Sequence, residues 1–278
     1  MRIIGDGSIE TILDTLIRHQ FLQNAIAAGL LSGFAAGITG TYVVVRNISY
    51  IGGGISHALL GGLGVAYALG MNPIIGAIIF AILSAWIIGL VRIRLRQHED
   101  TAISALWAFG MAIGIMCINI TPGYRVDLIS YLFGNILMVT GETLVILSAL
   151  DVVIAVVVFI FFQPLMYICF DEEYSAVRGL PVSVVYLLLL TLVALTVVVL
   201  IQAVGIILVI ALLTLPAASA RIFSRSIGRM MLISVILSEM YILAGLVLSF
   251  VFNIPSGSSI IVAAVAGYVV TLTIKRLK

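Results

Sequence analysis

The chain has 278 residues, of which 63% are hydrophobic and only 9% are charged, and its formal net charge is +2. A soluble domain carries roughly 25% charged residues, so this composition excludes a water-soluble globular protein and indicates an integral membrane protein. No apolar run alternates with period two, which argues against a membrane β-barrel. The sequence has no basic patch, and we therefore expect no nucleic acid among its partners.

The first 20 residues predict a helix on the membrane surface. They hold three acidic residues before Arg18 and lack a long apolar core, unlike a cleaved signal peptide. Their apolar residues recur at helical spacing, at Ile9, Ile12, Leu13, Leu16 and Ile17. Segment 1–20 is therefore predicted to be an amphipathic helix that lies on the bilayer.

The rest of the chain is a series of apolar runs, each about 20 residues long, as a bilayer-spanning helix requires. The runs lie near 21–45, 48–70, 73–91, 101–120, 142–163, 182–202, 204–222, 230–252 and 257–274. They predict an all-α, polytopic membrane bundle of about nine transmembrane helices, with residues 1–278 forming a single transmembrane domain. The number of spans would be eight if the runs on either side of Gln202 and Gly205 did not form two separate spans. Pro216 lies inside a run and is expected to kink or break that helix.

Basic residues predict the orientation of the bundle. Most of them fall in alternate loops, at Arg46, at Arg92, Arg94 and Arg96, at Arg178, at Arg221, Arg225 and Arg229, and in the tail with Lys275, Arg276 and Lys278. Cytoplasmic loops carry an excess of Lys and Arg, so the N-terminus is predicted outside and the C-terminus inside. Arg2, Arg18 and Arg125 are exceptions to this pattern.

Two segments are not predicted to be transmembrane helices. Segment 121–140 is too polar at its start to face lipid and is expected to fold at the outer surface. Segment 171–180 predicts a short capped helix on the cytoplasmic side, because an N-cap acid, acidic residues in the first turn, a basic residue in the last turn and a terminal glycine follow one another. These residues are Asp171, Glu172, Glu173, Arg178 and Gly179. Such a helix is either a plain connector or a coupling helix that docks onto a cytoplasmic partner.

Segment 48–70 combines the length of a membrane span with a histidine near its middle. Gly53 and Gly61 lie four residues before and after His57, and with Gly64 they share its helix face. A face of such small residues lets another helix approach closely or leaves room for a small ligand. We interpret it as the wall of a translocation path.

Ionisable residues inside a membrane cost roughly 2.5–3.5 kcal/mol each on insertion scales, so each of them suggests a function. His57, Asp151 and Glu239 lie in the second, fifth and eighth runs and are predicted at similar depth, while Asp127 lies in the outer segment. An imidazole clustered with carboxylates would bind a divalent cation, with nitrogen favouring zinc and oxygen favouring manganese. A purely structural role remains an alternative for His57, Asp151 and Glu239. His57 could bond a backbone carbonyl between helices, and Asp151 could bond a neighbouring serine.

Several kinds of chemistry are excluded or unsupported. The chain has no HExxH or GxSxG motif and no nucleophile–base pair at useful spacing, so we do not expect an enzyme. Its only lysines are Lys275 and Lys278 at the tail, which excludes a GxxxxGK[ST] phosphate-binding loop. Any use of ATP must therefore belong to a partner.

Five stretches of sequence follow one another in a fixed order: VRNISYIGGGISHALLGGLGVAYALG, VDLISYLFGNILMVT, FDEEYSAVRGLP, QAVGIILVIALLTLPAASAR and NIPSGSSIIVAAVAG. Together they resemble the motifs of the ABC-3 family, the permeases of zinc and manganese ABC importers, over nearly all of residues 20–275. Within the second stretch, the motif YLFGN is most similar to that of the zinc-type permeases. The FDEEYSAVRGLP stretch resembles the cytoplasmic coupling helix of that family.

One position departs from the family pattern. The family usually has Asp four residues before the histidine, forming a pair thought to contact the metal in transit, whereas this chain has Gly53. Three alternatives follow. Another carboxylate, with Glu239 the first choice, replaces the missing one, or the site is nitrogen-based and weak, or two copies of His57 share a metal across a dimer axis.

The resemblance implies a permease homodimer in the bacterial cytoplasmic (inner) membrane. Its implied partners are two ABC ATPase subunits at the cytoplasmic face and an extracytoplasmic metal-binding protein. No permanently bound cofactor is expected, and the cargo would be a divalent metal ion, with zinc preferred to manganese or iron. A secondary transporter driven by ion gradients is a rival interpretation, but the chain has no second copy of GGGISHALLGG. A purely structural membrane subunit is a further rival, which His57 and Glu239 argue against.

Overall fold

The computed structural model describes residues 20–95, 99–121, 134 and 136–277. Within these residues every regular element is helical, which confirms the predicted all-α class. Nine helices of the described chain are long and apolar enough to cross a membrane, as predicted. The predicted helix at 1–20 lies outside the described residues, apart from Gln20, which begins the first span. Most of segment 121–140 lies outside them as well.

The spans begin with α2 (Gln20–Arg46), α3 (Ser49–Ala68), α4 (Pro73–Leu90) and α5 (Glu99–Ile120). The π-helical turn η1 (Val91–Leu95) continues α4. The later spans are α7 (Gly141–Ile160), α10 (Val182–Val204), α11 (Ile206–Phe223), α12 (Ile227–Phe252) and α13 (Ser256–Leu277). Three short elements complete the described chain: η2 (Ile136–Met138), α8 (Phe162–Phe170) and α9 (Glu172–Val177).

Helix boundaries follow from local sequence signals. Gly205 has φ +83°, a conformation that side chains with a Cβ rarely adopt, and it separates α10 from α11 into two spans. Pro216 lies within α11, which continues to Phe223, so the proline does not end this helix.

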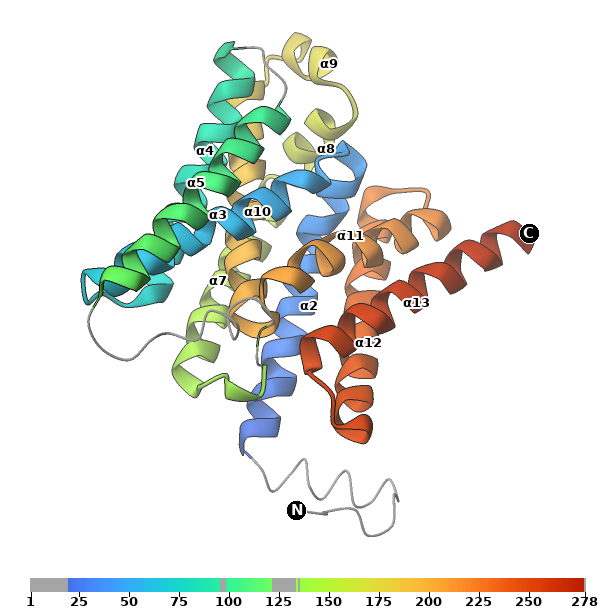
Figure 1. Ribbon diagram of the computed structural model, residues 1–278. Coiled ribbons are helices and arrows are strands. Elements are labelled where there is room, and N and C mark those ends of the chain that lie inside the picture. Colours follow the sequence, from blue (N-terminus) through green and yellow to red (C-terminus); the bar gives the residue numbers. More distant parts are fainter. Residues whose placement is uncertain (1–19, 96–98, 122–133, 135, 278) are drawn as a thin grey trace.

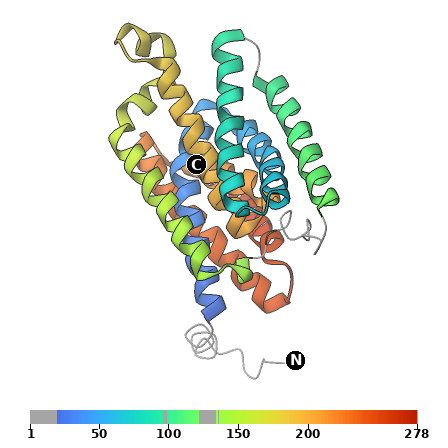
Figure 2. The same ribbon diagram turned by 90° about the vertical axis from the view of Figure 1, so that its left-hand side faces the viewer.

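Figures 1 and 2 show the bundle with α2 and α10 in its interior. Helices α2, α3 and α10 are mostly buried, whereas less than a third of α5, α7, α12 and α13 is buried. Helix α2 packs against α10, α11 and α12, and its other neighbours include α7 and α8. Helix α3 packs most extensively against α5 and next against α4, so α3, α4 and α5 form a subgroup beside the bundle core.

The basic ends of the helices gather on one side of the molecule. The last turns of α2 and α4 and the short helix α9 lie toward the upper part of Figure 1, whereas the first turn of α2 lies at the opposite end. Arg46 ends α2, Arg92 and Arg94 lie in η1, and Lys275 and Arg276 lie in the last turn of α13. The basic ends of α2 and α4 thus lie on the same side of the bundle as α9.

Candidate functional site

His57 lies in α3 and stacks on an aromatic ring of the neighbouring helix. Its imidazole and the Trp107 indole of α5 have centroids 4.1 Å apart and planes inclined by 8°. The Nδ1 atom of His57 is buried and has no hydrogen-bond partner in the described residues. The backbone carbonyl that a purely structural histidine would contact at this nitrogen is therefore not there. A buried imidazole nitrogen without a partner has its lone pair or its proton available to a ligand.

Part of the predicted glycine wall is closed by α5. A Cβ added to Gly61 would lie 2.9 Å from the carbonyl oxygen of Gly110, and one added to Gly64 would lie 2.6 Å from that of Gly114. These small residues let the backbones of α3 and α5 approach closely, which side chains would prevent. The expectation that the whole glycine face is open is thus corrected at Gly61 and Gly64, where α5 of the same chain covers it.

Gly53 has a different neighbour. A Cβ at this position would lie 2.8 Å from Cδ1 and 3.3 Å from Cγ1 of Ile210 in α11. These atoms form the outer end of a flexible side chain, which can change rotamer at moderate cost. The position that the family pattern gives to an aspartate therefore faces an adaptable apolar side chain.

The two membrane carboxylates lie in other helix contacts. Asp151 of α7 is only 4% exposed, and neither of its carboxylate oxygens has a hydrogen-bond partner in the described chain. The serine partner that a structural role would supply is therefore not present. Glu239 of α12 packs against α2, with its Cγ 3.1 Å from the place that a Cβ of Gly33 would occupy.

The predicted cluster of His57, Asp151 and Glu239 does not form within one chain. Among the described residues, no three His, Cys, Asp or Glu side chains are close enough to hold a metal ion together. The reason is topological: α3 packs against α4 and α5, whereas α7 and α12 both pack against α2. Asp127 lies outside the described residues. The assignment of each residue as a metal ligand remains a prediction, and a site shared by two copies of His57 remains compatible with this arrangement.

The structure forms the short helix predicted at 171–180 as α9. The Tyr174 amide donates to Oδ1 of Asp171 at 2.9 Å, so Asp171 is the N-cap residue as expected. Gly179 has φ +78° and follows the last turn, where glycine is favoured because it lacks a Cβ. The helix is therefore defined by its own capping residues.

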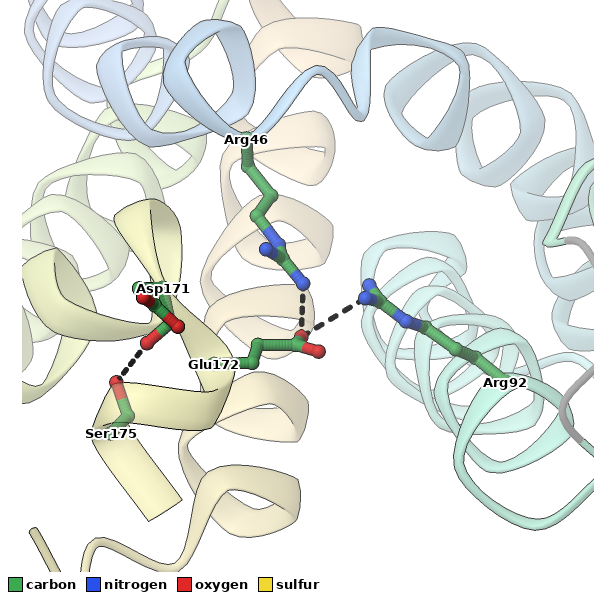
Figure 3. A network of polar contacts seen from close by, with 5 residues as sticks. All are labelled: Arg46, Arg92, Asp171, Glu172 and Ser175. Carbon is green, nitrogen blue, oxygen red and sulfur yellow. Dashed lines mark hydrogen bonds and ion pairs between the residues drawn. The ribbon is translucent and has the colours of Figure 1, made fainter. Parts of the chain in front are cut away.

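Glu172 points into the protein and not away from it (Figure 3). Its Oε1 accepts hydrogen bonds from Nη2 of Arg46 and, at 3.0 Å, from Nη2 of Arg92. Both guanidinium groups lie near the ring of Tyr186 in α10, with their Cζ atoms 5.9 and 4.5 Å from its centroid. Sequence reasoning grouped Glu172 with Glu173 and missed this network, because its members are 80 and 126 residues apart.

The outer side of α8 and α9 is apolar. Val177 is 89% exposed, and Phe170 and Tyr174 are exposed large side chains beside it. Arg178 covers the rings of Tyr167 and Tyr174, with its Cζ 5.4 and 5.1 Å from their centroids. A projection of exposed apolar and aromatic side chains on an otherwise well-capped helix is typical of a protein-docking surface.

Comparison with known proteins agrees with this architecture. Residues 18–275 match the model of the ABC 3 transport family. The chain is 41% identical over 268 residues to an uncharacterized membrane protein of Synechocystis sp., covering 96% of this chain and 95% of the relative. It is 33% identical over 258 residues to the manganese transport system membrane protein MntC of Halalkalibacterium halodurans, covering 93% of this chain and 88% of the relative.

A solved structure has the same fold. The chain superimposes on a chain of PsaBC from Streptococcus pneumoniae, solved in complex with Fab, with a TM-score of 0.86. The two are 34% identical, and the alignment covers 95% of each chain. The helical arrangement and the sequence motifs therefore point to the same group of proteins.

Proposed function

Because the chain belongs to the ABC 3 transport family, and is thus a permease of a metal ABC importer, we propose that it carries a divalent transition-metal ion past His57, with zinc as the preferred cargo. It would act in a bacterial cytoplasmic membrane as a homodimer. Two ABC ATPase subunits would supply the energy, and an extracytoplasmic metal-binding protein would deliver the ion. The permease itself performs no chemistry on its cargo.

The proposal rests on the position of His57 in a membrane span and on its buried Nδ1 atom, which lacks a hydrogen-bond partner in the described chain. Such an arrangement costs free energy in a membrane, which is a reason to infer a function for the group. Transient binding of a metal ion is a function that suits a neutral imidazole, which is the commonest protein ligand for transition metals.

The preference for zinc is argued from the ligand type. Imidazole nitrogen suits zinc, whereas manganese favours carboxylate oxygens, and position 53 lacks the carboxylate of the family pattern. Manganese is the second candidate, because the Halalkalibacterium halodurans relative is named a manganese transport protein and the chain retains Asp151 and Glu239 in its spans. A site in which either carboxylate of a second copy approaches His57 would favour manganese.

The basic side of the bundle would face the cytoplasm. Lys and Arg accumulate in cytoplasmic loops, and α9 lies on the same side as the ends of α2 and α4 (Figure 1). The exposed side chains of Phe170, Tyr174 and Val177 would then meet the ATPase. Nucleotide binding would move α9 and open the path alternately to the two sides of the membrane.

The test is ATP-dependent uptake of radioactive zinc and manganese by the complete transporter in proteoliposomes. His57→Ala should lower uptake at least about tenfold, because even outer-shell partners of metal ligands are worth about 10–100-fold in affinity or activity. His98→Ala, in a predicted cytoplasmic loop, is the matched control and should transport normally. Normal uptake by an assembled His57→Ala transporter would refute the role of His57, and faster manganese than zinc uptake by the wild type would refute the zinc preference.

A further inference from the structure

We propose that Glu172 is a positioning residue that ties α9 to both helices of the His57–Trp107 stack, through Arg46 on one side and Arg92 on the other. The inference rests on the proposed function, because it assigns to Glu172 the transfer of motion from α9 to the metal site. It concerns contacts within this chain and not the surface of α9 that meets a partner.

The junction joins three helical elements at one carboxylate oxygen and a fourth through the ring of Tyr186. Arg46 ends α2, Arg92 lies in η1 at the end of α4, Glu172 begins α9, and Tyr186 lies near the start of α10. Both arginines donate to Oε1 of Glu172 (Figure 3). The Arg46 side chain is only 14% exposed and that of Glu172 is 35% exposed, so water screens their attraction less than it screens a surface ion pair.

The Arg46 branch leads to His57. Only Asn47 and Ile48 separate the last residue of α2 from the first residue of α3. This joint is tight, because Asn47 has φ +60° and the Ile48 amide donates to the Val43 carbonyl at 3.0 Å. The short joint therefore transmits a displacement of Arg46 almost fully to the start of α3, which lies two helical turns before His57.

The Arg92 branch leads to Trp107. Helix α4, which η1 continues, packs against α3 and α5. The contact with α3 is a backbone contact: a Cβ added to Gly76 of α4 would lie 2.4 Å from the Gly62 carbonyl oxygen. Helix α5 is held against α3 in the same way at Gly110 and Gly114. Interfaces of this kind move as units and do not deform continuously, so a displacement of α4 is passed to α5.

A single carboxylate thus ties α9 to the unit of α3, α4 and α5 that carries both rings. If α9 moves, both guanidinium groups must follow Glu172 or lose their charge-assisted hydrogen bonds. Arg94 lies two residues after Arg92 in η1 and is exposed, and no hydrogen bond or ion pair joins it to Glu172 within the described chain. Arg94→Gln removes one charge beside Arg92 and leaves α9 unchanged, so it is the matched control.

The first readout is coupling in the complete transporter with its ATPase subunits in proteoliposomes. Glu172→Gln keeps the shape of the side chain but removes its charge. We expect ATP hydrolysis to continue while metal uptake per ATP falls about tenfold, the effect of one charge-assisted hydrogen bond. Arg94→Gln should leave uptake per ATP unchanged.

The second readout follows the stack itself. The chain has two tryptophans, so a Trp86→Phe permease labelled with 5-fluorotryptophan reports Trp107 alone when unlabelled ATPase subunits are added. The fluorine resonance should shift on nucleotide binding in the otherwise wild-type chain and in Arg94→Gln. In Glu172→Gln this shift should be lost, which a merely local structural role of Glu172 would not cause.

The outcomes separate the two proposals. Failure of the wild type to take up metal refutes the proposed function, whatever the fluorine signal does. A wild type that transports metal, with Glu172→Gln matching Arg94→Gln in both readouts, overturns the inference, as does a wild-type resonance that nucleotide leaves unchanged. If Glu172→Gln does not assemble, Arg92→Gln breaks one branch alone and must lose the fluorine shift for the inference to stand.

Discussion

The two halves of the glycine-rich face of α3 look alike in sequence and yet meet different surfaces. Near Gly53 the neighbour is the end of the Ile210 side chain, which can change rotamer. At Gly61 and Gly64 the neighbours are the backbone carbonyls of Gly110 and Gly114, which cannot move unless a whole helix moves. Glycine therefore faces an adaptable side chain in one half and makes a close, rigid contact between helices in the other.

His57 lies between these halves, and its ring stacks on a helix that the rigid half holds in place. The difference suggests a division of labour within α3. The rigid half keeps α3, α4 and α5 together as a unit, whereas the adaptable half can change its packing without separating the helices. Substitutions in the two halves should therefore differ in which property of the protein they change, as well as in the size of the effect.

The largest effect on stability is expected in the rigid half. Gly64→Ala puts a Cβ 2.6 Å from the Gly114 carbonyl oxygen, so α3 and α5 must separate. Overpacking of this kind typically costs about 1–3 kcal/mol, which should appear as a lower melting temperature of the purified permease in detergent. Gly141→Ala is the control, since a Cβ there meets nothing within 4 Å. Equal melting temperatures for the two variants would mean that the α3–α5 contact is not rigid.

Much of the fold could be predicted from the sequence because its signals are local. A run of about 20 apolar residues is sufficient to identify a span, and Gly205 between two such runs is sufficient to separate α10 from α11. The helix at α9 was predictable for the same reason, since Asp171 and Gly179 cap it within ten residues of sequence. None of these features depends on which helices become neighbours.

Helix pairing could not be predicted in this way. In lipid, apolar faces have no hydrophobic reason to prefer one neighbour to another, so the sequence does not indicate that Gly64 meets Gly114 or that His57 meets Trp107. The expected metal cluster failed within one chain for this reason, since it assumed that residues at one depth are neighbours. The bond from Arg92 to Glu172 likewise depends on a tertiary contact 80 residues apart.

An intermediate effect is expected at the stack. Trp107→Ala removes the ring that holds the His57 imidazole in place. Aromatic pairs are worth about 0.5–1.5 kcal/mol beyond area burial, so under the proposed function the affinity for the transported ion should fall by about two- to tenfold. Trp107→Phe keeps an aromatic face and should lie near the wild type. The measurement is the concentration dependence of zinc uptake, and an unchanged dependence in Trp107→Ala would show that His57 needs no support from α5.

The smallest effect on stability is expected at Gly53. Gly53→Ala gains roughly 0.5–1 kcal/mol of helix propensity, which offsets the cost of moving the end of Ile210, so the melting temperature should stay close to that of the wild type. A loss as large as that of Gly64→Ala would show that the two halves do not differ.

Gly53→Asp uses this tolerance to test the cargo. It places a carboxylate four residues before His57 on the same helix face, which restores the pair of the family pattern. Oxygen ligands favour manganese, so the ratio of manganese to zinc uptake should rise relative to both the wild type and Gly53→Ala. The alanine variant separates the effect of the carboxylate from the effect of displacing Ile210. An unchanged ratio in a well-folded Gly53→Asp transporter would mean that position 53 does not face the ion, and the adaptable half of α3 would then have to be explained by helix packing alone.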